Sequence, residues 1–334
     1  MHDRPRPYST FTPIRTQGFS LVELMVSLAI SMVVVIAATS VYLGTREAQR
    51  TLFEKAYAFE SAKFALDIIG RDIENAGFYP AIRVQTNTSS PNTVSAQFYT
   101  NPIVTNPPAA YDTAVFGCQA RQYLPAASTP ACGAHSTTVD ADALVLNYYS
   151  NDAAGLDIGN RADCLRQDAA DDPLNSTRRN AAHTTPSTAI NTNLLPLSPL
   201  FVSNRYTLLA TPMQVEGQAI STFSLACNGN GKNPADNTYQ SLIAGIDQLR
   251  FYFLVTADGT SHFKRADAVG TDWPNVTAVR VCLLARSLQS ARLQGAASYS
   301  IDDCDGTSHA YTDGLVRRVF SQVFALKNQL HDTF

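Results

Sequence analysis

The chain has 334 residues, of which 45% are hydrophobic and 16% charged, and its formal net charge is -3. This composition is typical of a folded protein, and the length is enough for one large domain or two smaller lobes with a real core. Lysine and arginine are spread thinly and form no basic stripe, so the charge pattern argues against nucleic acid as a partner.

Residues 1–18 are basic. Arg4, Arg6 and Arg15 are opposed by Asp3 alone, so this segment carries +2 and the remainder of the chain -5. Positive charge beside an apolar segment favours the cytoplasmic side of a membrane. We therefore expect this segment to stay in the cytoplasm and the globular part of the chain to lie outside it.

An uncharged apolar run extends from Leu24 to Leu43. As a helix that rises 1.5 Å per residue, this run spans about 30 Å, the thickness of the hydrocarbon layer of a bilayer. Glu23 directly precedes it, although a carboxylate near lipid costs about 2 to 3 kcal/mol. An ordinary membrane anchor is one alternative, but it does not explain Glu23. A secretory signal peptide is another, but its apolar stretch is about 7 to 15 residues and ends at a small-residue cleavage site.

The helical pattern continues beyond the apolar run. Leucine, phenylalanine and isoleucine recur every seven positions between 52 and 73, and charged residues lie mostly off this stripe, as in an amphipathic helix. The helix should end at about Ala76, because Gly77 can take the left-handed cap conformation and Pro80 cannot continue a helix. One such helix would be roughly 85 Å long.

The remaining sequence is rich in Asn, Thr, Ser and Pro, with short apolar runs between turn signals. Six runs are typical of strands: Asp142–Tyr149, Arg205–Ala210, Ala219–Ala226, Gln248–Val255, Val276–Leu284 and Val316–Ala325. An antiparallel sheet over the helix would bury one face of each element. We therefore predict an α+β fold, with irregular surface loops at 80–135 and 150–200.

These patterns divide the chain into four segments. We expect a leader at 1–18, the transmembrane half of the helix at 19–44, its amphipathic half at 45–77, and a β-rich globular domain at 78–334.

Six cysteines form an even set with no C-x-x-C pair, which favours disulfides in an oxidising compartment over zinc or thioredoxin-like chemistry. Fifteen pairings are possible. A disulfide that closes a short loop costs less chain entropy than one that closes a long loop. We therefore favour Cys118 with Cys132, Cys164 with Cys227, and Cys282 with Cys304. The alternative is that one pair is absent or exchanged.

The N-terminal junction resembles the class III signal of type IV pilins and type II secretion pseudopilins. It reads Gly18-Phe19-Ser-Leu-Val-Glu23 before the apolar run. The resemblance implies that a prepilin peptidase cuts between Gly18 and Phe19 and methylates the new N-terminus at Phe19, and that Glu23 acts in assembly. A carboxylate buried in a filament core needs a cation, and the α-amino group of a neighbouring subunit is the nearest candidate.

Three segments, 63–79, 225–227 and 273–287, are similar to those of PilW-type minor pilins. This resemblance implies a structural protein without enzymatic activity or cofactor, which primes pilus assembly at the inner membrane. Its partners would be other minor pilins, the major pilin and a tip adhesin. The globular domain would lie in the periplasm and later in the extracellular pilus, at or near the tip, and the pilus would serve twitching motility, cell adhesion or DNA uptake.

Major pilins usually carry a proline about twenty residues into the mature chain. Here the first proline after Gly18 is Pro80, which argues against a bulk filament subunit. The alternatives to a minor pilin are a J-like pseudopilin of type II secretion, a tip-located adhesion or DNA-binding module, and an anchored periplasmic enzyme. The extra loops favour the pilus over the secretion system.

The sequence holds no G-x-S-x-G, H-E-x-x-H or G-x-x-x-x-G-K motif, so neither enzyme chemistry nor a small-molecule substrate is expected. Its later histidines are scattered singly: His135, His183, His262, His309 and His331.

An acidic group, Asp302, Asp303 and Asp305, departs from the D-x-D-x-D-G calcium loop, and we expect a solvated turn rather than a metal site. Aromatic residues at 148, 149 and 251–253 lack interleaved basic residues, so we expect them in the sheet core.

Overall fold

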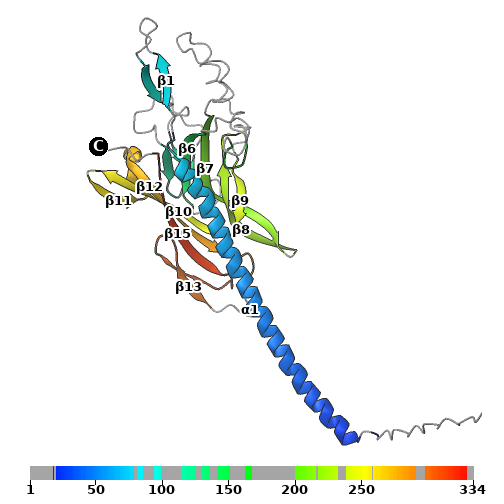
Figure 1. Cartoon of the computed structure of the whole chain (residues 1–334). Coiled ribbons are helices and arrows are strands. Elements are labelled where there is room, and N and C mark those ends of the chain that lie inside the picture. Colours follow the sequence, from blue (N-terminus) through cyan, green and yellow to red (C-terminus); the bar gives the residue numbers. More distant parts are fainter. Residues whose placement is uncertain are drawn as a thin grey trace, which may run out of the picture. The chain divides into compact units, whose positions relative to one another are not determined.

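A computed structural model describes residues 18, 20–78, 81–85, 94–98, 114–124, 130–135, 141–150, 162–167, 200–215, 217–231, 238–257, 259–290 and 298–328. These residues form the expected α+β fold, with one long helix and antiparallel sheets (Figure 1). Two compact units divide the chain, Met1–Arg50 and Thr51–Phe334. Most of the predicted leader, and Phe19, lie outside the described residues.

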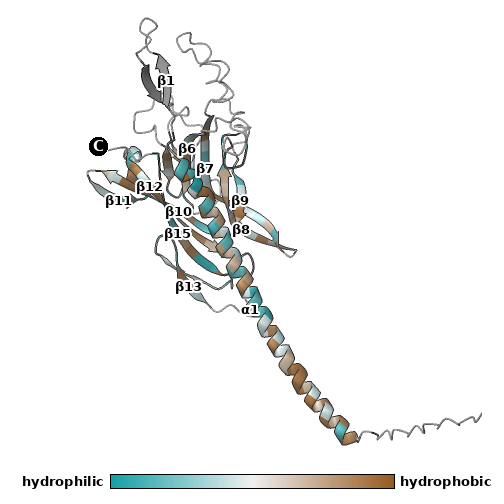
Figure 2. Cartoon of the chain, in the orientation of Figure 1, coloured by the Kyte–Doolittle hydropathy of each residue, from teal (hydrophilic) through white to brown (hydrophobic). Residues whose placement is uncertain are grey.

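Helix α1 extends over 55 residues, Leu21–Asn75. Its first part is the apolar run, which is brown in Figure 2. In the described part of the chain, α1 is the one helix long and apolar enough to cross a membrane. The helix ends where the sequence predicts, because Gly77 has a φ of 79° and thus takes the left-handed conformation.

The larger sheet has five antiparallel strands in the order β3-β6-β7-β8-β9. Their bounds are Val115–Cys118, Ala143–Ser150, Leu200–Val215, Gln218–Asn228 and Gln240–Ala244. The second sheet has four antiparallel strands in the order β11-β10-β12-β15. Their bounds are Thr260–Lys264, Ile246–Ala257, Val276–Arg286 and Arg317–Ala325.

Shorter elements complete the described part of the chain. Three two-stranded ribbons are β1 (Ala81–Gln85) with β2 (Val94–Phe98), β4 (Gln122–Tyr123) with β5 (Cys132–Gly133), and β13 (Tyr299–Asp302) with β14 (Ser308–Tyr311). A helical turn, α3, covers Ala266–Val269, and a 3-10 turn covers Trp273–Asn275.

All six predicted strands are present, with ends that differ by a few residues. The expectation of irregular loops over 80–135 was wrong, because β1 to β5 lie there. Strand β3 is fully buried and pairs with β6. Its four residues are too few to show an alternating pattern, and Gly117 interrupts them. The glycine is required, since a Cβ there would overlap the ring of Phe253.

One hydrophobic core joins the second half of α1 to both larger sheets. Ile69 and Ile73 of α1, Leu146 of β6, Phe251 of β10 and Leu283 of β12 are completely buried in it. Three disulfides join Cys118 to Cys132, Cys164 to Cys227, and Cys282 to Cys304, which are the pairs favoured from the sequence.

Candidate functional site

The predicted processing junction lies at the start of α1. The backbone N–H of Ser20 donates a hydrogen bond to Oε2 of Glu23 at 3.1 Å, and the N–H of Leu24 donates to the Ser20 carbonyl oxygen at 3.1 Å. Glu23 thus occupies the third helical position and caps the helix, where a negative charge also complements the helix dipole. Gly18, Ser20 and Glu23 are all exposed. The carboxylate is therefore open to a partner.

The side chains of the apolar run beyond Glu23 are exposed rather than packed in a core. Every residue from Ser20 to Arg46, with all its large apolar side chains, is exposed. Its hydroxyl groups instead bond to carbonyl oxygens within the helix, for example Ser27 to Leu24 at 2.9 Å and Ser31 to Ser27 at 2.7 Å. Because these polar groups are satisfied internally, the surface suits lipid or other apolar helices.

The half-buried carboxylate of Asp72 fastens the end of α1 to the five-stranded sheet. Oδ2 of Asp72 accepts hydrogen bonds from the Tyr206 hydroxyl at 2.5 Å and from the Asn204 amide at 2.6 Å. The Tyr148 hydroxyl donates to Oδ1 at 3.2 Å. Burial raises the pKa of Asp72, and the three hydrogen bonds offset part of that rise. Side chains from β6 and β7 therefore hold the C-terminal end of α1 on the sheet.

The four-stranded sheet holds another stretch of α1. The ring of Phe324 on β15 lies so close to Gly70 that a Cβ on the glycine would overlap it. The rings of Phe59 and Phe320 are 5.8 Å apart in an edge-to-face arrangement. An open groove runs between helix and strand, lined by Phe59, Lys63, Leu66, Phe320, Ser321 and Gln322.

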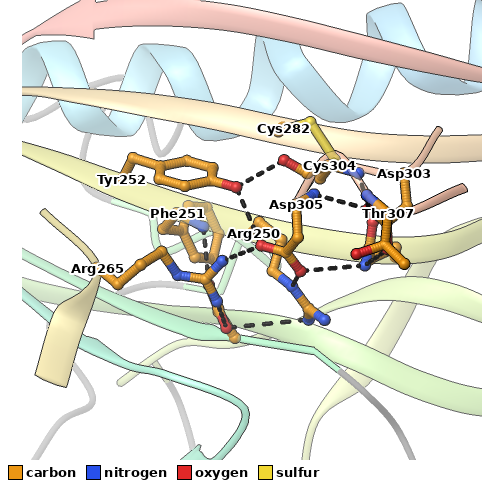
Figure 3. The surroundings of a disulfide bond; sticks show 11 residues. Arg250, Phe251, Tyr252, Arg265, Cys282, Asp303, Cys304, Asp305 and Thr307 are labelled. Carbon is orange, nitrogen blue, oxygen red and sulfur yellow. Dashed lines mark hydrogen bonds and ion pairs between the residues drawn. A yellow bond between two sulfur atoms is a disulfide. The ribbon is translucent and has the colours of Figure 1, made fainter. Parts of the chain in front are cut away.

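A disulfide anchors the turn between β13 and β14 on the four-stranded sheet (Figure 3). Next to Cys304, the carboxylate of Asp305 accepts hydrogen bonds from Arg250 Nε at 2.8 Å and Arg265 Nη1 at 2.5 Å. Arg265 also pairs with buried Asp142 at 2.9 Å. Partial burial would raise the pKa of Asp305, but the hydrogen bond from Arg250 and the charges of both arginines outweigh it and lower this pKa.

Asp303, the second carboxylate of the acidic group at 302–305, also has protein partners. Asp303 accepts bonds from the Gln248 amide at 3.1 Å and from the backbone N–H of Thr307 at 2.8 Å, and its carboxylate lies 3.0 Å from His309 Nε2. No group of three His, Cys, Asp or Glu side chains able to hold a metal occurs among the described residues. Within that part of the chain, Asp303 and Asp305 brace the turn, while Asp302 and Asp305 are exposed, as expected of a solvated turn.

The structure brings together few of the other residues considered from the sequence. Tyr148, Tyr149, Phe251 and Phe253 are buried as expected. Tyr252 is not in the core, because it points to the opposite face of β10 from its neighbours, between Arg265 and Arg280. The Nε2 atom of His135 lies 2.7 Å from the carbonyl oxygen of Ala141, while His183 and His331 lie outside the described residues.

Asp72 and Asp142 were not anticipated from the sequence. Each has at least one apolar neighbour and another acidic residue two positions away, a pattern shared by many surface residues. Asp72 is three residues past Ile69 on α1, at the edge of the apolar stripe, and this position was the one available signal that it faces the sheets.

Comparison with known proteins identifies both ends of the chain. Residues 213–328 match the family described as type IV pilus-assembly protein W, and residues 14–39 match the prokaryotic N-terminal methylation motif. Among solved structures, the chain is similar to a type IV-like pilin from Thermus thermophilus, with 10% identity, 81% of this chain and 96% of that chain covered, and a TM-score of 0.37. No curated protein matches the chain.

Proposed function

We propose that this chain, a type IV pilin-like protein of the PilW type, is a minor pilin that primes pilus assembly at the inner membrane with other minor pilins. The observation that carries the proposal is the start of α1, where Gly18 precedes the helix and the exposed Glu23 lies in its first turn, ahead of an apolar part that covers no core of its own. An exposed apolar helix requires lipid or neighbouring helices.

On this proposal, the chain is processed, anchored and assembled. Residues 1–18 are the cytoplasmic leader, and a prepilin peptidase removes it by cutting between Gly18 and Phe19 and methylates Phe19. Residues 19–44 hold the mature chain in the membrane, 45–77 form the amphipathic half of α1, and 78–334 form the periplasmic domain. During assembly, Glu23 leaves its own helix cap and pairs with the α-amino group of a neighbouring subunit, which fixes the register between the two helices.

Several features support a role at initiation, at or near the tip, rather than in the bulk of the fibre. The helix has no proline before Pro80, and the globular domain carries three disulfides, which suit an extracellular position. Proteins of the pilin family are structural, and the described residues form ion-pair clusters that brace strands and turns. Partners on this account are other minor pilins, the major pilin and a tip adhesin.

The proposal is tested by deleting the gene and measuring two outputs in the same cells. We expect surface pili, counted by electron microscopy, to fall at least tenfold, while type II secretion of a reporter exoprotein is unchanged. The wild-type gene should restore the pili. Normal piliation with lost secretion would instead identify a J-like pseudopilin, and normal values of both would contradict a role in assembly.

A further inference from the structure

The face of the four-stranded sheet that points away from α1 carries an arginine to which the described residues supply no counter-ion. Arg280 is on β12, directly opposite Tyr252 on β10 and Val323 on β15. Side chains alternate along β15, and Phe324 packs on α1 at Gly70, so Val323 is on the other face. Arg280 shares that face with Cys282, two residues further along β12.

Two aromatic rings hold the Arg280 guanidinium in place. Its Cζ atom is 4.0 Å from the ring centroid of Tyr252 and 5.0 Å from that of Phe263. Tyr252 is fixed in turn, because its hydroxyl donates hydrogen bonds to the Cys304 carbonyl oxygen at 2.6 Å and to Asp305 at 3.1 Å. The arginine is therefore pre-organised by stacking rather than by an ion pair.

The nearby carboxylates already have partners. Asp305 is bound by Arg250 and Arg265, and Asp142 by Arg265. Among the residues that the structure describes, none lies within ion-pair or hydrogen-bonding distance of Arg280, and its Nε is buried without an acceptor. Arg280 is thus a surplus cation in a chain whose net charge is negative.

Apolar side chains flank this cation on both sides. Val323 is 51% exposed and Phe263 is 40% exposed. The disulfide-anchored turn covers the sheet around Cys282 but leaves these two side chains open. A stacked arginine between exposed apolar residues has the composition of a protein-interface hot spot. One cation without a basic groove does not suit the phosphates of a nucleic acid.

We propose that Arg280, Val323 and Phe263 form a docking surface for another pilus subunit, which places an aspartate or glutamate on Arg280 and an apolar side chain against Val323. Charge complementarity identifies the partner. The surface supplies an oriented guanidinium group with free hydrogen-bond donors, so a carboxylate of the partner is the group that would pair with it. That the partner is a pilus subunit rests on the proposed function. The contact through the sheet would be separate from contacts that α1 makes with neighbouring helices.

Site-specific photocrosslinking in pilus-producing cells tests the proposal. A photoreactive amino acid replaces Val323 in the full chain, and mass spectrometry locates the adduct. We expect an adduct with a different pilus subunit, within a few residues of an aspartate or glutamate. Arg280→Glu should lower its yield at least tenfold, and exchanging the identified carboxylate for arginine should restore it.

Arg318→Glu is the matched control, because Arg318 is exposed on β15 and belongs to the opposite face of the strand. Arg318→Glu should leave the yield of the crosslinked adduct unchanged. Both variants should have the same thermal unfolding midpoint as the parent protein. The proposal is overturned by the absence of an adduct, by one that persists in Arg280→Glu, or by one with a second copy of the chain, lipid or nucleic acid. Methylation of Phe19 and pilus number, measured in the same cells, separate failure of this surface from failure of the proposed function.

Discussion

The Tyr206 hydroxyl donates a 2.5 Å hydrogen bond to the half-buried carboxylate of Asp72, which joins the end of α1 to β7 across 134 positions in sequence. The apolar stripe of α1 selects the helix face that packs on the sheets. Asp72 adds three directional hydrogen bonds, from Tyr206, Asn204 and Tyr148, at the end of this face. This cluster therefore fixes the orientation of the end of α1 more sharply than apolar packing alone.

Removal of the Tyr206 hydroxyl should destabilise the protein. Tyr206→Phe leaves the half-buried Asp72 carboxylate without its closest donor, and we expect a loss of about 1 to 3 kcal/mol in the free energy of unfolding. Chemical denaturation of the detergent-solubilised chain measures this loss. The denaturant concentration at the unfolding midpoint should fall, while the dependence of the unfolding free energy on denaturant concentration stays unchanged. The control is Tyr311→Phe, because the Tyr311 hydroxyl has no hydrogen-bond partner among the described residues; it should change stability by less than about 0.5 kcal/mol.

The protonation of Asp72 should make stability depend on pH. Burial raises the pKa of Asp72 in the folded state above its ordinary value of 3.8, so the folded protein holds this proton more tightly than the unfolded chain. The resulting stabilisation is complete below the unfolded pKa and is lost as the pH rises through the folded pKa. Wild type should gain stability relative to Asp72→Asn as the pH is lowered from neutral towards 4. Denaturation curves of both proteins at several pH values measure this difference, and a constant difference would be inconsistent with a raised pKa.

Gly70→Ala should reverse the usual effect of this substitution in a helix. Alanine normally stabilises a helix by about 1 kcal/mol relative to glycine. At Gly70 the added methyl group overlaps the buried ring of Phe324, and overpacking of this kind costs about 1 to 3 kcal/mol. Thermal melts should show a lower midpoint for Gly70→Ala, and Phe324→Leu in the same chain should restore part of it. A stabilised Gly70→Ala protein would show that α1 and β15 do not pack this closely.

Replacement of Glu23 should separate processing from assembly. Glu23→Ala removes the carboxylate but leaves Gly18 and Phe19 intact, so we expect cleavage and methylation to proceed and recovery of the chain in sheared pili to fall at least tenfold. Glu60→Ala is the matched control, since Glu60 is an exposed glutamate later on the same helix. Immunoblots of cell and pilus fractions measure both steps. Equal recovery of the Glu23 and Glu60 variants would argue against a role for the Glu23 carboxylate.

The sequence predicts a structural element best where that element depends on residues close together in the chain. The uncharged run, the seven-residue apolar repeat and the Gly77 cap locate α1 to within about two residues of its observed end. Six strands are visible as apolar runs, and loop-closure entropy favours the three observed disulfides. Strand β3 was missed because four residues around Gly117 carry no alternation. The clusters at Asp72 and Asp305 join residues distant in sequence, and their partners become apparent only when the strands are placed.

The most direct test of the central claim is the mass and sequence of the N-terminus of the membrane-extracted protein, from cells with and without the prepilin peptidase. The account predicts a mature chain that begins at N-methylated Phe19 in the presence of the peptidase and an intact leader in its absence. A chain that still begins at Met1 when the peptidase is present, or one cut within the apolar run near Ala38, would contradict it.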